Sequence, residues 1–252
     1  MAQFDCNFHS YVLRHPVSIN VTVPSISSCE RDNPSHVLKD RFPVIYLLHG
    51  GGNDRSCWLR YTSAERYAEE HRIALVTCSV GNSAYLNVEN GERFYDFVAD
   101  ELPEFLNNYF PISTRPEDSY MVGYSMGGYG TILHTFTHPE RFAAVGFFSP
   151  GIGLPNREGR PSNRPDGITL TKEAVAKGVK LPKIFICIGQ NDFLYESVTQ
   201  YHHLLDELGV AHRYDDLPGY EHEFAIWDRE LEAFMDWLPR TDSYLAQVPY
   251  KI

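Results

Sequence analysis

The stretch that decides the fold is Tyr120-Met121-Val122-Gly123-Tyr124-Ser125-Met126-Gly127-Gly128-Tyr129-Gly130. It begins at the end of an apolar run that follows two turn-forming prolines, and apolar side chains at helical spacing continue after it. This context predicts a strand, a sharp turn and a helix, and it disfavours a glycine-rich turn with a passive serine. Gly123 and Gly127 lack the β-carbons that would block the turn, so the Ser125 hydroxyl is expected to stand exposed. Ser125 is the candidate nucleophile.

Length and charge limit the class of protein. With 252 residues and no low-complexity segment, the chain fits one large α/β domain, which buries about 70–75% of its unfolded surface. The formal net charge of -11 argues against a nucleic-acid or anionic-membrane surface, because like charges repel. We therefore expect a small-molecule substrate. A homo-oligomer is compatible with the sequence.

The cysteines and the first residues of the chain indicate the cellular compartment in which the protein is expected. The five cysteines form no C-x-x-C pair and are odd in number, which argues against a disulfide framework and against a zinc site. The first residues lack a basic start followed by an apolar stretch, and no run reaches the roughly 18 apolar residues of a membrane span. We expect a cytoplasmic protein with free thiols and no membrane partner.

The order of predicted elements indicates a mostly parallel sheet. Residues 4–13 and 17–23 alternate apolar and polar side chains, which predicts an antiparallel N-terminal hairpin. Residues 24–41 have loop composition, and residues 43–48 form a continuously apolar strand. Strands and helices then alternate, so we expect an α/β fold with helices on both faces of the central sheet.

The strand at 43–48 leads into His49-Gly50-Gly51-Gly52-Asn53-Asp54, the second stretch with chemical content. Acyl transfer develops negative charge on a carbonyl oxygen, which fixed N–H donors must stabilise. A His-Gly-Gly-Gly turn can supply one N–H from Gly51, and Met126 can supply the other. The run lacks a P-loop lysine and the spacing of a dinucleotide fingerprint, which disfavours phosphate binding. His49 is expected to brace the turn.

Several stretches are candidates for the walls of a pocket. Trp58 and Tyr124 are candidate substrate contacts, although Trp58 is equally compatible with the core. The polar loop at 81–93 leaves the carboxyl end of a strand and is expected to form another wall. Residues 150–181 are rich in glycine, proline and charge, which predicts a lid or insertion, with one short helix at 169–177, inside a single domain spanning 1–252.

The other two members of a catalytic triad follow in the second half of the chain. Asp192 comes directly after an apolar strand at 182–188, and His222 lies in a loop between a short strand and the last helix. The order Ser125, Asp192, His222 is that of α/β-hydrolases, each residue lying on a loop after a strand. His222 would take the serine proton, and Asp192 would fix its tautomer.

Other histidines and carboxylates are weaker candidates. His134 and His138 are spaced four apart on one helix, but no third ligand accompanies them, so no metal site is predicted. His202-His203 falls within a predicted helix and is interpreted as surface or packing. Asp215-Asp216 offers rival acids, yet both lie in the short strand, where solvated carboxylates are ordinary.

Four stretches together resemble the esterase D and tributyrin esterase family, and are similar to feruloyl esterases and S-formylglutathione hydrolases. They are 48–54, 123–130, 189–193 and 222–224. The resemblance implies an α/β-hydrolase fold, carboxylic ester or thioester hydrolysis without a cofactor, a catalytic triad of Ser125, Asp192 and His222, and an oxyanion hole formed by Gly51 and Met126.

The resulting hypothesis is a serine carboxylesterase that hydrolyses small feruloyl, cinnamoyl or short-chain acyl esters through an acyl-enzyme. The glycine-rich sequence after His49-Gly50 is unlike that associated with S-formylglutathione hydrolases. Two alternatives stay open: a thioesterase resembling S-formylglutathione hydrolase, and a hydrolase-fold protein that binds a ligand without turning it over.

Overall fold

The computed structural model describes residues 1–25, 36–153 and 165–248. These residues form an eight-stranded sheet with the order β1-β2-β4-β3-β5-β6-β7-β8. Its strands are β1 Ala2–His9, β2 Pro16–Val23, β3 Val44–Leu48, β4 Ala74–Cys78, β5 Ser119–Tyr124, β6 Ala144–Phe148, β7 Lys183–Gly189 and β8 His212–Leu217. β1 with β2 and β2 with β4 pair antiparallel, and the remaining neighbours are parallel. The predicted α/β-hydrolase fold with an N-terminal hairpin is confirmed.

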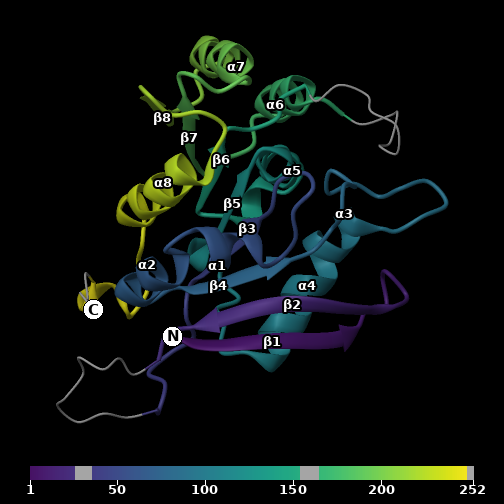
Figure 1. Ribbon diagram of the computed structural model, residues 1–252, viewed down its shortest axis with the longest axis vertical. Coiled ribbons are helices and arrows are strands. Elements are labelled where there is room, and N and C mark those ends of the chain that lie inside the picture. The colour runs from purple at the N-terminus through teal and green to yellow at the C-terminus, as the bar shows by residue number, and fades with distance from the viewer. Residues whose placement is uncertain (26–35, 154–164, 249–252) are drawn as a thin grey trace.

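Helices cover both faces of the sheet, as Figure 1 shows. The α-helices are α1 Cys57–Tyr61, α2 Ala64–His71, α3 Phe94–Asp96, α4 Leu102–Tyr109, α5 Met126–Thr137, α6 Gly167–Ala176, α7 Tyr195–Glu207 and α8 Phe224–Trp237. A π-helical turn, η1 Phe97–Glu101, joins α3 to α4, and short 3₁₀ turns are η2 Pro116–Asp118, η3 Pro139–Arg141 and η4 Leu245–Gln247. Within the described ranges, every helix falls short of the length or apolarity that a bilayer span needs.

Two hydrophobic cores lie on opposite faces because successive side chains of a strand point in opposite directions. In β3, Val44, Tyr46 and Leu48 belong to the core under α4, α5, α6 and α7. Ile45 and Leu47 belong to the core under α1, α2 and α8. The central strands therefore bury both faces, which is why they read as continuous apolar runs.

The N-terminal hairpin is shorter than predicted. Its first strand ends at His9, and residues 10–15 form the turn, where the sequence predicts a strand reaching residue 13. The reason is the buried Glu101 of η1. Its carboxylate accepts hydrogen bonds from the Ser10 hydroxyl, from the Tyr11 N–H at 2.7 Å and from the Val12 N–H at 3.3 Å. These N–H groups are thereby drawn away from a strand ladder.

The predicted lid or insertion at 150–181 is described only in part, since residues 154–164 lie outside the described residues. The predicted short helix is present as α6, and the Asp166 side chain caps it by accepting from the Thr169 N–H at 2.8 Å. α6 packs against α5 through the same core. The Tyr129 hydroxyl donates to the Pro165 carbonyl at 2.6 Å. A lid function for this stretch stays a prediction.

Candidate active site

The candidate nucleophile lies at a strained turn between β5 and α5. Ser125 has φ 56°, a region that non-glycine residues rarely adopt. A β-carbon on Gly123 would lie 2.2 Å from the Gly127 carbonyl oxygen, and one on Gly127 would lie 2.3 Å from the Leu48 carbonyl oxygen. Both glycines are therefore required by close backbone approach, as the G-x-S-x-G pattern predicts.

Backbone hydrogen bonds hold this turn in place. The Ser125 N–H donates to the Phe148 carbonyl at 3.0 Å, and the Ser125 carbonyl accepts from Tyr129 at 3.1 Å and Gly151 at 3.0 Å. Ser125 is half-buried, whereas both of its sequence neighbours are only 1% exposed. In this turn Ser125 is therefore partly accessible to solvent, whereas the residues on either side of it are buried.

The candidate base and acid form a direct pair. The Nδ1–H of His222 donates to Oδ2 of Asp192 at 2.8 Å, and the Leu194 N–H donates to the other carboxylate oxygen at 2.8 Å. The Asp192 side chain is fully buried, while the His222 ring is 18% exposed. In the neutral ring this hydrogen bond places the lone pair on Nε2, the nitrogen that a general base uses.

The rival acids have other partners. Asp215 pairs with the Arg213 guanidinium, whose Nε lies 2.9 Å from the carboxylate, and Asp216 accepts from the Tyr195 hydroxyl at 2.9 Å. Both lie on β8, before the loop that carries His222. Of the three aspartates considered, the structure pairs Asp192 with this histidine.

A tryptophan absent from the predicted site links the histidine to the serine turn. The Trp227 ring stacks on Tyr124, the residue before Ser125, with 4.1 Å between ring centroids. The His222 ring meets it edge-on at 5.0 Å, and its indole N–H donates to the Ser149 hydroxyl at 3.1 Å. Trp227 lies in α8 only five residues after His222, but no sequence pattern marks it as part of a site.

The glycine-rich turn is fixed from both sides. His49 is 1% exposed, its Nδ1–H donates to the Gly50 carbonyl at 2.8 Å, and its Nε2 accepts from the Val80 N–H at 3.1 Å. Burial lowers the pKa of His49. Its ring is therefore neutral and committed to the backbone, the bracing role that the sequence predicts.

The loop after β4 also holds this turn. Asn82 accepts from the Gly52 N–H at 2.8 Å, and the buried Tyr85 hydroxyl donates to the His49 carbonyl at 2.9 Å. The sequence predicts this loop as a pocket wall without choosing residues, and Asn82 and Tyr85 are the ones that contact the turn. Because the Gly52 N–H is already engaged, the candidate donor is the exposed Gly51, which lies between two neighbours held by hydrogen bonds.

The second candidate oxyanion donor is set by helix geometry. Met126 is the first residue of α5, so its N–H has no helical carbonyl one turn earlier to bond. The helix dipole adds partial positive charge at this end. Ser125 and the Met126 N–H therefore adjoin one another at a helix N-terminus, a location suited to stabilising an anion.

Trp58 and Tyr124, the predicted substrate contacts, lie behind the turn. Trp58 is 0% exposed and donates its indole N–H to the Leu48 carbonyl at 3.0 Å. Tyr124 is 1% exposed, and its hydroxyl accepts from the Asn53 side-chain amide at 2.8 Å. The rings of Trp58 and Tyr124 meet edge-on at 5.2 Å. Both support the glycine-rich turn, and direct contact with substrate stays a prediction.

His134 of α5 and His138, which directly follows this helix, have packing roles. His134 is 1% exposed and stacks on Tyr95 with 4.8 Å between centroids. Burial lowers its pKa to about 3, so the ring is neutral at physiological pH. His138 lies 3.5 Å from the Glu140 carboxylate. Neither residue lies at the carboxyl end of the sheet.

The fold and this arrangement define an α/β-hydrolase. Parallel strands β5, β7 and β8 end at one edge of the sheet, and Ser125, Asp192 and His222 follow them in that order. The strained serine turn, the aspartate–histidine pair and the braced glycine turn are arranged as expected for the site of a serine hydrolase. Residues 28–238 match the model of the esterase family described as "Putative esterase". The chain belongs to this family.

Individual relatives agree with the family assignment. An acetyl esterase of Caldicellulosiruptor saccharolyticus is 24% identical over 266 residues, covering 95% of this chain and 99% of its own. Among solved structures, the fluorophosphonate-binding serine hydrolase FphF of Staphylococcus aureus is 29% identical with a TM-score of 0.85, covering 95% of this chain and 99% of that one. The S-formylglutathione hydrolase FrmB of the same organism is 29% identical, covers 94% and 98%, and has a TM-score of 0.81. This chain is therefore a serine hydrolase that acts on carboxylic esters.

Proposed function

We propose that Ser125, His222 and Asp192 catalyse the hydrolysis of small carboxylic esters through an acyl-enzyme. The observation that carries this proposal is the 2.8 Å hydrogen bond from His222 to the buried Asp192, which orients the imidazole. The strained, half-exposed Ser125 supports it independently. Serine alone is a weak nucleophile, so an oriented base is the requirement that the pair meets.

In the proposed reaction, Nε2 of His222 accepts the Ser125 proton while the serine oxygen attacks the ester carbonyl carbon. The tetrahedral intermediate collapses, the alcohol leaves, and His222 returns the proton to it. Water then attacks the acyl-enzyme with the same base. Asp192 holds the Nδ1–H and stabilises the imidazolium that forms in each half-reaction.

The N–H groups of Gly51 and Met126 are the proposed donors to the oxyanion. Met126 lies at the start of α5, and His49 and Asn82 fix the backbone on both sides of Gly51. Donors that are rigid before reaction cost no reorganisation when charge develops, which is why such a site stabilises the transition state.

For the substrate, we propose a short or small aromatic acyl group on an uncharged alcohol. The acetyl esterase relative supports short acyl groups. The runner-up is a thioester of the S-formylglutathione type, which the 29% identity to FrmB supports. Ferulic acid esterases among the structural neighbours are under 25% identical, so they support the fold alone.

We also propose a cytoplasmic location. Cys6, Cys57, Cys78 and Cys187 are free thiols, which agrees with a reducing compartment. A protein exported in tagged form and recovered with disulfides would contradict this location without affecting the catalytic proposal.

The test of the catalytic proposal is covalent labelling by a fluorophosphonate probe. We expect labelling of the wild type and of Ser18→Ala, whose half-buried serine lies on the hairpin, and no labelling of Ser125→Ala. His222→Ala should slow labelling strongly. Turnover of nitrophenyl acetate should fall by about 10⁴ to 10⁶ in Ser125→Ala and His222→Ala. A loss of only tenfold would contradict these roles.

A substrate panel then separates the two candidates. Specificity constants for nitrophenyl acetate, nitrophenyl butyrate, methyl ferulate and S-formylglutathione would be compared on the same preparation. We expect one of the three oxygen esters to rank first. If S-formylglutathione ranks first by a factor of ten or more, the runner-up is correct.

A further inference from the structure

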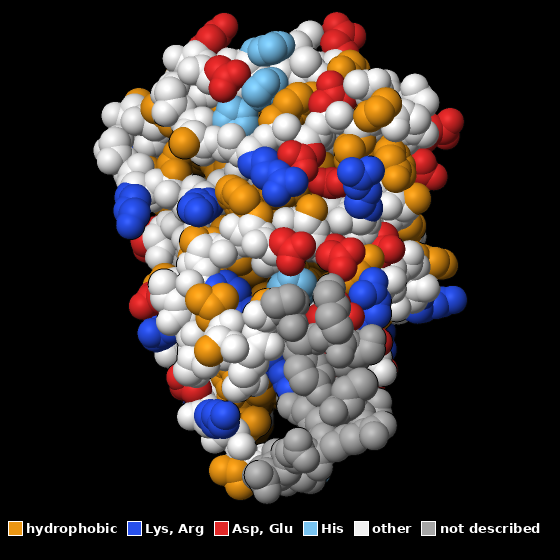
Figure 2. All heavy atoms as spheres, turned by 90° about the vertical axis from the view of Figure 1, so that its left-hand side faces the viewer, with side chains coloured by type: hydrophobic (Ala, Val, Ile, Leu, Met, Phe, Trp, Pro, Cys, Tyr) orange, Lys and Arg blue, Asp and Glu red, His pale blue; other side chains and the backbone are white. Residues whose placement is uncertain are grey.

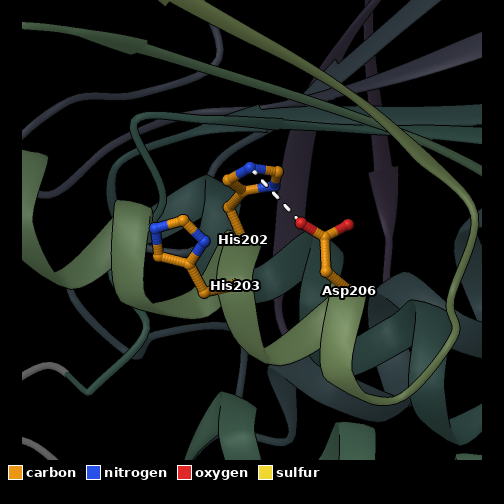
Figure 3. Close-up of side chains that lie close together, drawn as sticks. All are labelled: His202, His203 and Asp206. Atoms are coloured by element: carbon orange, nitrogen blue, oxygen red, sulfur yellow. Dashed lines mark ion pairs between the residues drawn. The ribbon is translucent and has the colours of Figure 1, made fainter.

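A group of histidines lies near the amino-terminal end of β8, whereas the candidate active site lies at the carboxyl ends of the parallel strands. His202, His203 and Asp206 are close together in the second half of α7, and one ligand atom from each lies within 4.8 Å of the others. Figure 3 shows His202 between His203 and Asp206. His212, the first residue of β8, adjoins them. The histidine side chains gathered at the α7 end of the molecule are visible in Figure 2.

The spacing along α7 places the three side chains on one patch of the helix surface. His202 and Asp206 are four residues apart, and His203 and Asp206 are three apart, so each pair can meet. The His202 Nε2 lies 3.6 Å from Oδ2 of Asp206. His203 and Asp206 are exposed, and His202 is half-buried, so an ion from solvent can reach all three.

A chain of hydrogen bonds fixes the orientation of His202. The Nδ1–H of the buried His212 donates to the Val210 carbonyl at 2.8 Å, which leaves its Nε2 as an acceptor in the neutral ring. The Nδ1–H of His202 donates to that nitrogen at 2.7 Å. The His202 ring also stacks on Tyr214, with 4.1 Å between centroids and 8° between planes. The lone pair of His202 is therefore on Nε2, the nitrogen that faces Asp206.

We propose that His202, His203 and Asp206 bind a divalent transition-metal ion, with Zn²⁺ as the best match. Two imidazole nitrogens and one carboxylate oxygen are ligands that Zn²⁺ takes, whereas Mg²⁺ and Ca²⁺ require mainly oxygen. A ligating histidine ordinarily donates its other N–H to an acceptor that fixes the ring, and His212 is that acceptor for His202. Water completes the tetrahedron.

The geometry needs little rearrangement. With ligand bonds of about 2.1 Å, the edges of a tetrahedral zinc site are about 3.4 Å long. The His202 to Asp206 distance of 3.6 Å already matches this value. The two remaining separations both involve His203 and lie within 4.8 Å, so rotation of this exposed side chain is the change that the site requires.

This site is distinct from the candidate active site. Asp192 follows the carboxyl end of β7, whereas His212 begins the parallel neighbour β8. A six-residue strand is about 17 Å long, so the ion would lie well away from the reacting ester. Binding would tie the second half of α7 to β8 through His202 and His212. The expected effect is on stability and not on turnover.

Isothermal titration calorimetry with ZnCl₂ tests the proposal on the full chain, with MgCl₂ as the comparison salt. We expect one high-affinity site per chain and no comparable heat with Mg²⁺. His203→Gln and Asp206→Asn should each weaken binding by at least tenfold. His9→Gln is the matched control, because His9 is also exposed but lies on β1 at the far edge of the sheet.

Thermal denaturation gives a second readout. Zn²⁺ should raise the melting temperature of the wild type and of His9→Gln by the same amount, because it binds the folded state. The rise should shrink in His203→Gln and Asp206→Asn. Equal Zn²⁺ affinity in all four proteins would overturn the proposal and assign the binding to other groups. Absence of saturable binding would leave His202 and Asp206 as a simple ion pair and overturn it equally.

Discussion

At the scale of single residues, the two carboxylate oxygens of Asp192 have separate tasks. One accepts from the Leu194 N–H and anchors the side chain, and the other accepts from His222. In Asp192→Asn the amide can present its NH₂ to His222, which favours the wrong tautomer of the ring. We expect turnover of nitrophenyl acetate to fall by about 10³ to 10⁴, with unchanged folding by circular dichroism.

The matched variant for this prediction is Asp216→Asn. Asp216 lies on the adjacent strand and accepts from the Tyr195 hydroxyl, without a hydrogen bond to His222 among the described contacts. Turnover in Asp216→Asn should stay within about threefold of the wild type, because Asp216 bonds to Tyr195 and not to a group that takes part in the proposed reaction. A larger loss in Asp216→Asn than in Asp192→Asn would show that the acid is misassigned.

The glycines of the serine turn allow a stability prediction. In Gly123→Ala the new β-carbon would lie 2.2 Å from the Gly127 carbonyl oxygen, and backbone cannot give way cheaply. We expect the free energy of unfolding to fall by about 3 kcal/mol or more, measured by urea denaturation. Gly153→Ala, where a β-carbon meets no atom within 4 Å, should change it by less than about 0.5 kcal/mol. Similar losses in both variants would show that the close approach is not what selects glycine.

The sequence predicts those residues of the site whose chemistry forces a local pattern. Ser125 needs flanking glycines, and Asp192 and His222 follow strands in a fixed order, so each is visible without a structure. Trp227 and Asn82 are not visible in this way. They act through contacts between distant elements, such as the hydrogen bond from the Gly52 N–H to the Asn82 amide oxygen. Many other residue types at these two positions would leave the local sequence pattern unchanged.

At the scale of elements, α8 carries a buried acid against β8. Glu230 is 1% exposed, and burial together with the neighbouring Asp215 raises its pKa to about 7. The ordinary value is near 4.5, so between about pH 4.5 and 7 the folded chain holds a proton that the unfolded chain has lost. Fewer protons bound by the unfolded state means that stability falls as pH rises through this window.

Glu230→Gln should remove this pH dependence. We expect the free energy of unfolding of the wild type to drop between pH 5 and pH 8 by about 1 to 3 kcal/mol more than that of the variant. Urea denaturation at both pH values measures the difference. If the two proteins lose stability in parallel, Glu230 is ionised throughout and the burial of α8 against β8 does not shift its titration.

Most elements are predictable, and their ends are not. The buried strands stand out because both faces are covered, as the continuous apolar run in β3 shows. The end of β1 depends on Glu101, which lies about ninety residues later and accepts from the Ser10–Val12 turn. The His202–His212 contact likewise joins α7 to β8. Contacts between residues so far apart in the sequence cannot be predicted from local sequence patterns.

At the scale of the whole molecule, the formal net charge of -11 acts on every charged ligand that approaches. The electrostatic field of the negatively charged protein repels anions, so anions associate more slowly at low salt. At 0.1 M salt the field is screened over about 10 Å. The association rate of a neutral ester does not depend on this field, because the ester has no net charge. Ionic strength therefore separates the two substrate candidates by a property of the whole surface and independently of pocket shape.

We expect the specificity constant for S-formylglutathione, which carries net negative charge, to rise about two- to fivefold between 10 and 300 mM NaCl. The constant for nitrophenyl acetate should change by less than about 1.5-fold, because it has no charge to screen. Stopped-flow or steady-state assays on one preparation give both numbers. If the anionic thioester reacts more slowly as salt increases, cationic side chains near Ser125 must outweigh the net charge, and an anionic substrate becomes the better candidate.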